Sequence, residues 1–109
     1  MATYLGGATV AGTVAGAALG QNAIADVSGA TALGTNSSVT VATGVALGSG
    51  SVANTAAGIA GYVPPTATAA QSAAIAATVA TKSAVDVGSR QITSVAAGTA
   101  DDDAVNVSQ

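Results

Sequence analysis

The segment ALGTNSSVTVATGV, residues 32–45, is one unit of a repeat that recurs every fourteen residues. Its opening Ala-Leu-Gly also begins the units at residues 18 and 46, and a related unit begins at Tyr4. The second position of the four units holds every leucine in the sequence, namely Leu5, Leu19, Leu33 and Leu47. Because chance does not place all the leucines in one column, the fourteen-residue period organises the fold.

Each unit has the pattern of two short strands separated by turns. Apolar residues alternate, as in Val39 and Val41 or Val45 and Leu47, which is the period of a β-strand. Gly, Asn and Ser, which turns favour, lie between these alternating stretches. Stacking the units ~4.8 Å apart places identical residues in rows. The sequence therefore predicts an all-β parallel solenoid whose leucines form an inward-facing core ladder.

Two other interpretations of the repeat fit less well. A Gly- and Ala-rich chain can be disordered or silk-like, but neither state explains the strict leucine column. A calcium-binding β-roll has a nine-residue repeat with regular Asp residues. Asp26 is the only Asp in the four units, so we reject that interpretation.

The composition predicts a thin interior and a need for association. The chain has 109 residues and no Phe or Trp, and its large aliphatic residues are four Leu, four Ile and fourteen Val. A flat unit of two strands leaves one narrow layer between them, which Ala, Ser and Val fit. Such a layer buries little apolar area in one chain, so we expect several identical chains to pack face to face.

Charge and residue content exclude several function classes. The net charge of −3, with two basic residues, gives no electrostatic footprint for nucleic acid or anionic lipid. No apolar run approaches the ~20 residues of a membrane span. Without His or Cys, neither a His-based triad nor a thiolate nucleophile is possible. We therefore expect a non-enzymatic protein that uses no cofactor and no metal.

The register breaks at Tyr62, where the next unit would place a glycine. Two consecutive prolines follow, and they cannot continue a ladder strand. Thr68 and Gln71 then have the spacing of a helix capping box ahead of an Ala-rich run. We predict a short helix or ordered loop within an insert spanning residues 62–82. The SAVDVG segment at residues 83–88 restores the strand pattern.

The last part of the sequence, SRQITSVAAGTADDDAVNVSQ at residues 89–109, carries the most specific motif. It resembles the neck of trimeric autotransporter adhesins, the YadA-like family of Gram-negative surface proteins, whose pattern is close to R-Q-I-x-N-V-A-x-G-x-x-x-T-D-A-V-N-V-x-Q. The matching positions are Arg90, Gln91, Ile92, Val95, Ala96, Gly98, Asp103, Ala104, Val105, Asn106, Val107 and Gln109. Ser94 and Asp102 depart from it, where Asn and Thr are usual. The repeat units and the insert likewise resemble that family's head repeats and head insert motifs.

The resemblance implies a left-handed parallel β-roll assembled as a homotrimer. Residues 1–88 would form the head, with its insert at 62–82, and residues 89–109 would form the neck and the start of a coiled-coil stalk. The neck would cross between subunits and hold the trimer through Arg90, Ile92, Val95, Asp103, Val105, Asn106 and Val107. The protein would lie on the bacterial surface, anchored in the outer membrane through a C-terminal part absent from this chain, without direct membrane contact here.

Two charged features have structural interpretations. The run Asp101-Asp102-Asp103 could bind a metal ion. We favour a helix capped by Thr99, with the carboxylates in its first turn. Arg90, the only arginine, is either a solvated charge or, as we favour, a neck residue that contacts a carbonyl group or an Asp of the cluster across subunits.

Two functions remain for such a protein. The first is an adhesive head that binds host cells or extracellular matrix proteins. The alternative is a structural spacer that holds another head away from the membrane and has no ligand of its own. Ice binding is more remote, because it favours regular rows of Thr, and the threonines here are scattered.

Overall fold

The computed structural model describes residues 16–109. The strands are β1 (Ala17–Leu19), β2 (Ile24–Ala25), β3 (Thr31–Leu33), β4 (Ser38–Val39), β5 (Val45–Leu47), β6 (Val52–Ala53) and β7 (Val85–Asp86). The helix α1 (Ala69–Ala77) lies between β6 and β7 in the sequence. The first predicted ladder position, Leu5, lies outside the described residues.

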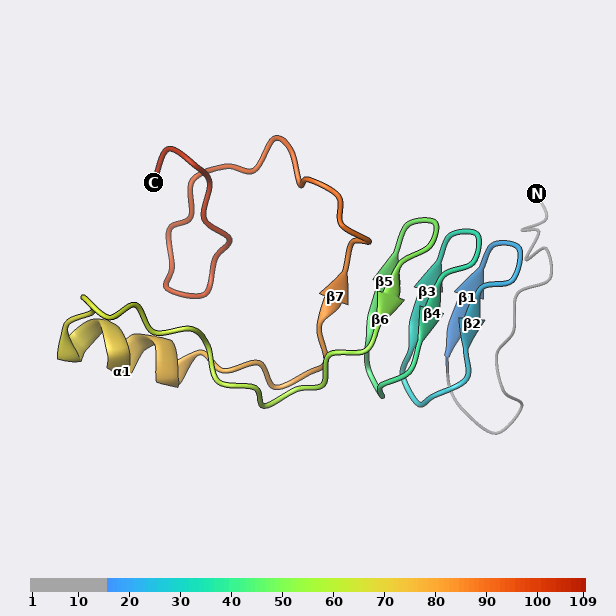
Figure 1. The fold of residues 1–109 in the computed structure, drawn as a ribbon, viewed down its shortest axis with the longest axis horizontal. Helices are drawn as coiled ribbons and strands as arrows, with labels where there is room; N and C mark the ends of the chain where they lie inside the picture. The colour runs from blue at the N-terminus through green and yellow to red at the C-terminus, as the bar shows by residue number, and fades with distance from the viewer. Residues whose placement is uncertain (1–15) are drawn as a thin grey trace.

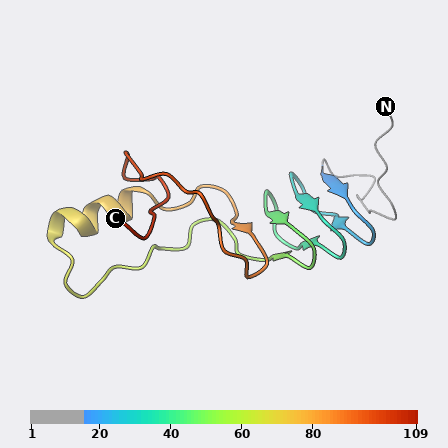
Figure 2. The same cartoon turned by 90° about the horizontal axis from the view of Figure 1, so that it is seen from above.

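The strands form two parallel sheets, so the all-β prediction is confirmed. One sheet has the order β1-β3-β5-β7 and the other the order β2-β4-β6. Partners are fourteen residues apart in the repeats, since Leu19 pairs with Leu33 and Leu33 pairs with Leu47. The pairs β1 and β2, β3 and β4, and β5 and β6 each place one strand in each sheet, and these three turns of the chain lie one behind another (Figures 1 and 2).

The layer between the two sheets is filled almost entirely by alanine. Its buried strand residues are Ala18, Ala32 and Ala46 from the first sheet and Ala25, Val39 and Ala53 from the second. Ser37 and Ser51 are also buried, and each hydroxyl donates to a carbonyl oxygen of its own turn, Gly34 at 2.7 Å and Leu47 at 3.0 Å. These bonds satisfy the buried hydroxyl groups.

The leucine ladder faces outward, which corrects the prediction of an inward-facing core ladder. Leu19 is half-buried, and Leu33 and Leu47 are 40% and 44% exposed. The alanine before each of these three leucines points inward, so the predicted strand register was wrong by one residue. The physical reason is the thinness of the layer. Short turns hold the two sheets too close together for a leucine in every unit.

A column of glycines lets the turns after β1, β3 and β5 stack in close contact. Gly20 and Gly34 have φ angles of 134° and 131°, which disfavour any side chain. A Cβ atom on Gly20 would lie 2.6 Å from the carbonyl carbon of Gly34, and one on Gly34 equally close to that of Gly48. Both the backbone angle and the close contact therefore explain why glycine occupies positions 20 and 34.

The helix α1 begins at the capping box that the sequence predicted. Thr68 Oγ1 accepts a hydrogen bond from the Gln71 backbone N–H at 3.1 Å, and Gln71 Oε1 accepts one from the Thr68 N–H at 2.8 Å. At the other end, the Thr78 hydroxyl donates to the carbonyl oxygen of Ala74 at 3.0 Å. No residue of the helix is buried, and the helix stands away from the two sheets (Figure 1).

The insert leaves and rejoins the stack at one place. The Ala84 N–H donates to the Thr55 carbonyl oxygen at 3.0 Å, which joins the two chain segments at its base. Strand β7 then pairs with β5 in parallel, with Val85 opposite Val45. The segment containing α1 is therefore an insertion between β6 of one sheet and β7 of the other.

Residues 87–109 contain no strand or helix, which corrects the expected start of a stalk helix at the end of the chain. Thr99 does not cap a helix. Instead, its N–H donates to Asp103 Oδ2 at 2.8 Å, and the Ala100 N–H donates to the same atom at 3.0 Å. Residues 104–109 are too few for a stable isolated helix, and Val105 and Val107 are β-branched.

We expect Gly34→Ala to destabilise the fold much more than Gly50→Ala. Gly50 also has a positive φ angle, 74°, but nothing lies within 4 Å of a Cβ built there. Gly50→Ala should lower the free energy of unfolding by ~1 kcal/mol through backbone strain. Gly34→Ala should lower it by at least ~2 kcal/mol more, because its Cβ overlaps Gly48. Urea unfolding followed by circular dichroism measures both. If both variants lose the same free energy of unfolding, close stacking of the turns is not the reason for glycine at position 34.

Candidate assembly site

The outer side of the β1-β3-β5-β7 sheet is an apolar surface, which we call the outer leucine face. One row of this face contains Leu19, Leu33 and Leu47, and the other contains Ala17, Thr31, Val45 and Val85. Residues of β1 and β3 line a shallow groove of about 260 Å³ on it. A continuous apolar face on an exposed sheet is typical of an interaction surface.

The outer side of the β2-β4-β6 sheet is different. Its strand residues are Ile24, Ser38 and Val52, and the exposed positions two residues further on are Asp26, Thr40 and Asn54. Polar side chains thus interrupt the apolar ones in each unit. Of the two faces, only the outer leucine face is suited to close apolar packing against another chain.

Arg90 lies at the end of the stack, where the turn after β5 has no further unit beyond it. In the preceding turn, the carbonyl oxygens of Leu33 and Thr35 accept hydrogen bonds from the N–H groups of Gly48 and Gly50, at 2.7 and 2.9 Å. The corresponding acceptors in the last turn are the carbonyl groups of Leu47 and Ser49. A sheet that ends here leaves such acceptors without backbone donors.

The Arg90 guanidinium replaces the missing turn. Its Nη2 donates to the Ser49 carbonyl oxygen at 2.8 Å, and its Nη1 is 3.4 Å from Ser51 Oγ, which itself donates to the Leu47 carbonyl oxygen. A Cβ atom on Gly48 would lie 2.9 Å from Nη1, so the guanidinium also takes the place of the next glycine in the column. The sequence predicted a carbonyl contact for Arg90, but across subunits. The structure places it within one chain.

The C-terminal residues close into a loop through two amide side chains. Gln109 Oε1 accepts from the Gly98 N–H at 2.9 Å, and Gln109 Nε2 donates to the Gly98 carbonyl oxygen at 3.0 Å. Asn106 Nδ2 donates to the Val95 carbonyl oxygen at 3.1 Å. Asn106 was predicted as a neck residue. Gln109 was not, although it matches the neck motif at the last position.

The apolar neck residues do not come together in the single chain. Ile92, Val105 and Val107 are exposed, and Val95 is half-buried. The buried core of the described residues includes none of the four. These side chains therefore add to the apolar surface that the chain leaves open to water.

Asp103 is the carboxylate of the predicted neck set, and two backbone groups stabilise its charged form. The N–H groups of Ala100 and Thr99 donate to this carboxylate and lower the pKa of Asp103 below its ordinary value. Within residues 16–109, no three His, Cys, Asp or Glu side chains are close enough to hold a metal ion. Asp103 thus shapes a turn, and the acidic run does not converge on one point.

Comparisons with protein families and with curated proteins found no match. Among the described residues, no helix has both the length and the apolar character needed to cross a membrane. The function must therefore be argued from the geometry of the chain and from the neck-like motif.

We expect Arg90→Met to lower the free energy of unfolding by ~1–2 kcal/mol, because Met keeps the apolar stem but leaves carbonyl acceptors at the end of the stack without donors. Arg90→Lys should recover only part of this, since one ammonium group cannot reproduce a planar fork. Lys82→Met, which removes the other basic residue, is the matched control. If both Met variants unfold at the same urea concentration, the guanidinium does not cap the stack.

The turn held by Asp103 should depend on pH. Because the folded chain has the lower pKa, this contribution to stability is complete above the ordinary value of 3.8 and is lost as pH falls through the folded value. NMR should show the Asp103 carboxyl carbon and the amide protons of Thr99 and Ala100 titrating together, with a midpoint below 3.8. In Asp103→Asn, that common transition should disappear. Its persistence would assign the transition to another group.

Proposed function

We propose that this chain is the head and neck of a bacterial surface adhesin that works as a homotrimer and attaches to host cells or extracellular matrix. In this proposal each chain forms a left-handed parallel β-roll, and the neck joins the three chains above a stalk. The chain acts without enzymatic activity, cofactor or nucleic acid. The outer leucine face is the observation that carries the proposal, and the neck-like motif supports it.

The outer leucine face supports assembly because its apolar side chains have no place inside their own chain. Leu33, Leu47 and Val85 are 40%, 44% and 58% exposed. Burying each against a neighbouring chain would gain about 1 kcal/mol from the apolar area removed from water. The interior of one chain is built mainly from alanine and buries little apolar area. Burial of the outer leucine face against a neighbour is therefore large by comparison.

The turns of the units support a binding role over a catalytic one. The turns after β1, β3 and β5 share one pattern of backbone hydrogen bonds, but their exposed residues change: Gln21 and Asn22, then Thr35 and Asn36, then Ser49 and Gly50. A fixed scaffold with changing exposed turns is a common way to present a binding surface. Within residues 16–109, no three His, Cys, Asp or Glu side chains gather at one point.

Assembly is tested by Leu33→Asp, with Thr40→Asp on the other sheet as the control. Sedimentation equilibrium of the unaltered chain should give three times the mass of the 9.9 kDa chain. Leu33→Asp should give the single-chain mass, because assembly would bury an unpaired carboxylate. Thr40→Asp should remain trimeric. A monomeric unaltered chain, or a trimeric Leu33→Asp variant, would remove the leucine face from the interface.

Adhesion is tested by solid-phase binding of the purified trimer to collagen, fibronectin and laminin. We expect saturable binding to at least one of them, and weaker binding by Leu33→Asp through loss of multivalency. A stable trimer that binds none of these proteins and no host cells would favour the spacer function.

A further inference from the structure

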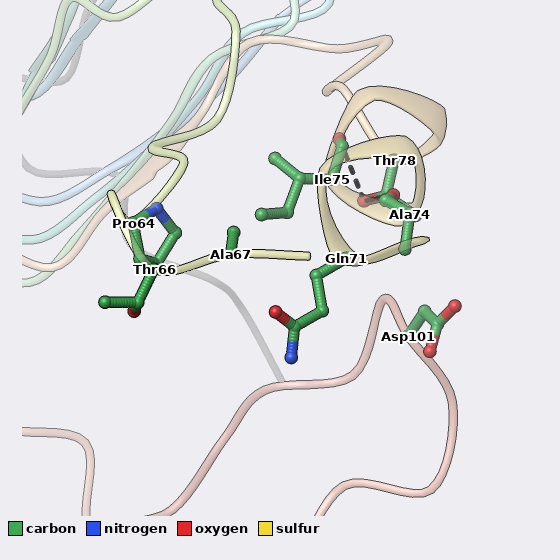
Figure 3. A pocket seen from close by; sticks show the side chains of 8 residues that line it. All are labelled: Pro64, Thr66, Ala67, Gln71, Ala74, Ile75, Thr78 and Asp101. Carbon is green, nitrogen blue, oxygen red and sulfur yellow. Dashed lines mark hydrogen bonds between the residues drawn. The ribbon is translucent and has the colours of Figure 1, made fainter. Parts of the chain in front are cut away.

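A groove of about 410 Å³ lies on the insert, away from the two sheets. Its lining is Pro64, Thr66, Ala67, Gln71, Ala74, Ile75, Thr78 and Asp101. Figure 3 shows Pro64 and Thr66 at one end and Ala74 with Asp101 at the other. The groove is therefore built from two segments, the insert and the C-terminal loop, and its volume is within the range of small ligand sites.

The insert is not needed to fill the core, which points to a role at the surface. No residue of α1 is buried, and the helix is held by its own cap and by the closed base of the insert. The groove floor nevertheless contains half-buried apolar side chains, Ala67, Ala74 and Ile75. Tyr62, just before the groove residues in the sequence, is 79% exposed. Exposed aromatic residues are enriched where proteins bind other proteins.

The charge of the groove favours a positively charged ligand. Among residues 16–109, Asp101 is the only charged residue that lines it, and this lining contains no basic side chain. The chain has two basic residues in all, and Arg90 caps the stack. A long cationic side chain can lay its methylene groups on an apolar surface while its charged end reaches a carboxylate. The groove offers an apolar floor with Asp101 at one end, and this exposed side chain is free to turn its carboxylate toward a bound cation.

We propose that this groove binds a lysine or arginine side chain presented by a partner protein, with the methylene groups on Ala74 and Ile75 and the charged end at Asp101. This inference rests on the proposed adhesive function and gives it a ligand class, a basic segment of a host protein. The bonding is non-covalent, and it should weaken as salt screens the charge pair.

The test is an NMR titration of the ¹⁵N-labelled chain with N-acetyl-lysine methylamide. N-acetyl-norleucine methylamide, which has the same stem without the charge, is the control probe. We expect the lysine probe to shift the amide signals of Ala67, Gln71, Ala74 and Asp101 to saturation, and the norleucine probe to shift them much less. No localised shifts with the lysine probe would overturn the proposal.

Two pairs of variants sharpen the result. Asp101→Asn should weaken binding about threefold, the usual size for one exposed charge pair, while Asp102→Asn should not. Ala74→Leu should fill the groove and abolish the shifts, while Ala76→Leu, on the same helix but outside the lining, should not. Unchanged binding by both Asp101→Asn and Ala74→Leu would refute the proposal. So would groove signals that shift on dilution of the protein alone, because a second copy would then cover the groove.

This titration separates the two proposals. It needs neither the trimer nor a matrix protein, so adhesion can fail while lysine binding holds. The converse result is also possible to recognise. If Asp101→Asn and Ala74→Leu trimers bind matrix proteins as well as the unaltered trimer, and the lysine probe causes no shifts, the adhesive function stands and its binding surface lies elsewhere.

Discussion

The small distance between the two sheets is the constraint on which the rest of the structure depends. Two strands joined by short turns leave space for one thin layer, and Ala18, Ala32 and Ala46 fill it from one side. The leucines that alternate with them must then point outward. The thin interior and the apolar exterior therefore have the same cause, the small distance between the two sheets. The same geometry that makes the single unit possible leaves apolar surface that a neighbour can cover.

Stacking of identical units has a second consequence, because a stack must end. Each turn satisfies the carbonyl groups of the turn before it, so the last turn is left with acceptors that need donors. Arg90 suits this position because its planar group carries several N–H donors in a fixed arrangement. Glycine at positions 48 and 88 leaves the space that the guanidinium occupies. The Arg90 side chain thus supplies hydrogen-bond donors at the end of the stack, where backbone N–H groups supply them within it.

The sequence could predict the local and repeated features of the fold. It could not predict the features that depend on the distance between elements far apart in the chain. The period, the parallel pairing and the cap at Thr68 follow from patterns within a few residues. The direction of Leu33 does not, because Ala32 and Leu33 are both apolar and alternation has two solutions. Only the distance to the second sheet decides between them. The partners of Arg90 likewise depend on where the chain returns after the insert, and the turn at Asp103 replaced an expected helix.

The insert shows how the stack and the candidate binding groove depend on each other. The groove needs Asp101 beside α1, and Asp101 lies in the segment that follows β7. That segment is positioned by the pairing of β7 with β5 and by the contacts of Arg90 with Ser49 and Ser51. The helix α1 carries its own cap and makes none of these contacts. The end of the stack therefore sets where the segment that carries Asp101 begins, although none of the residues at that end lines the groove.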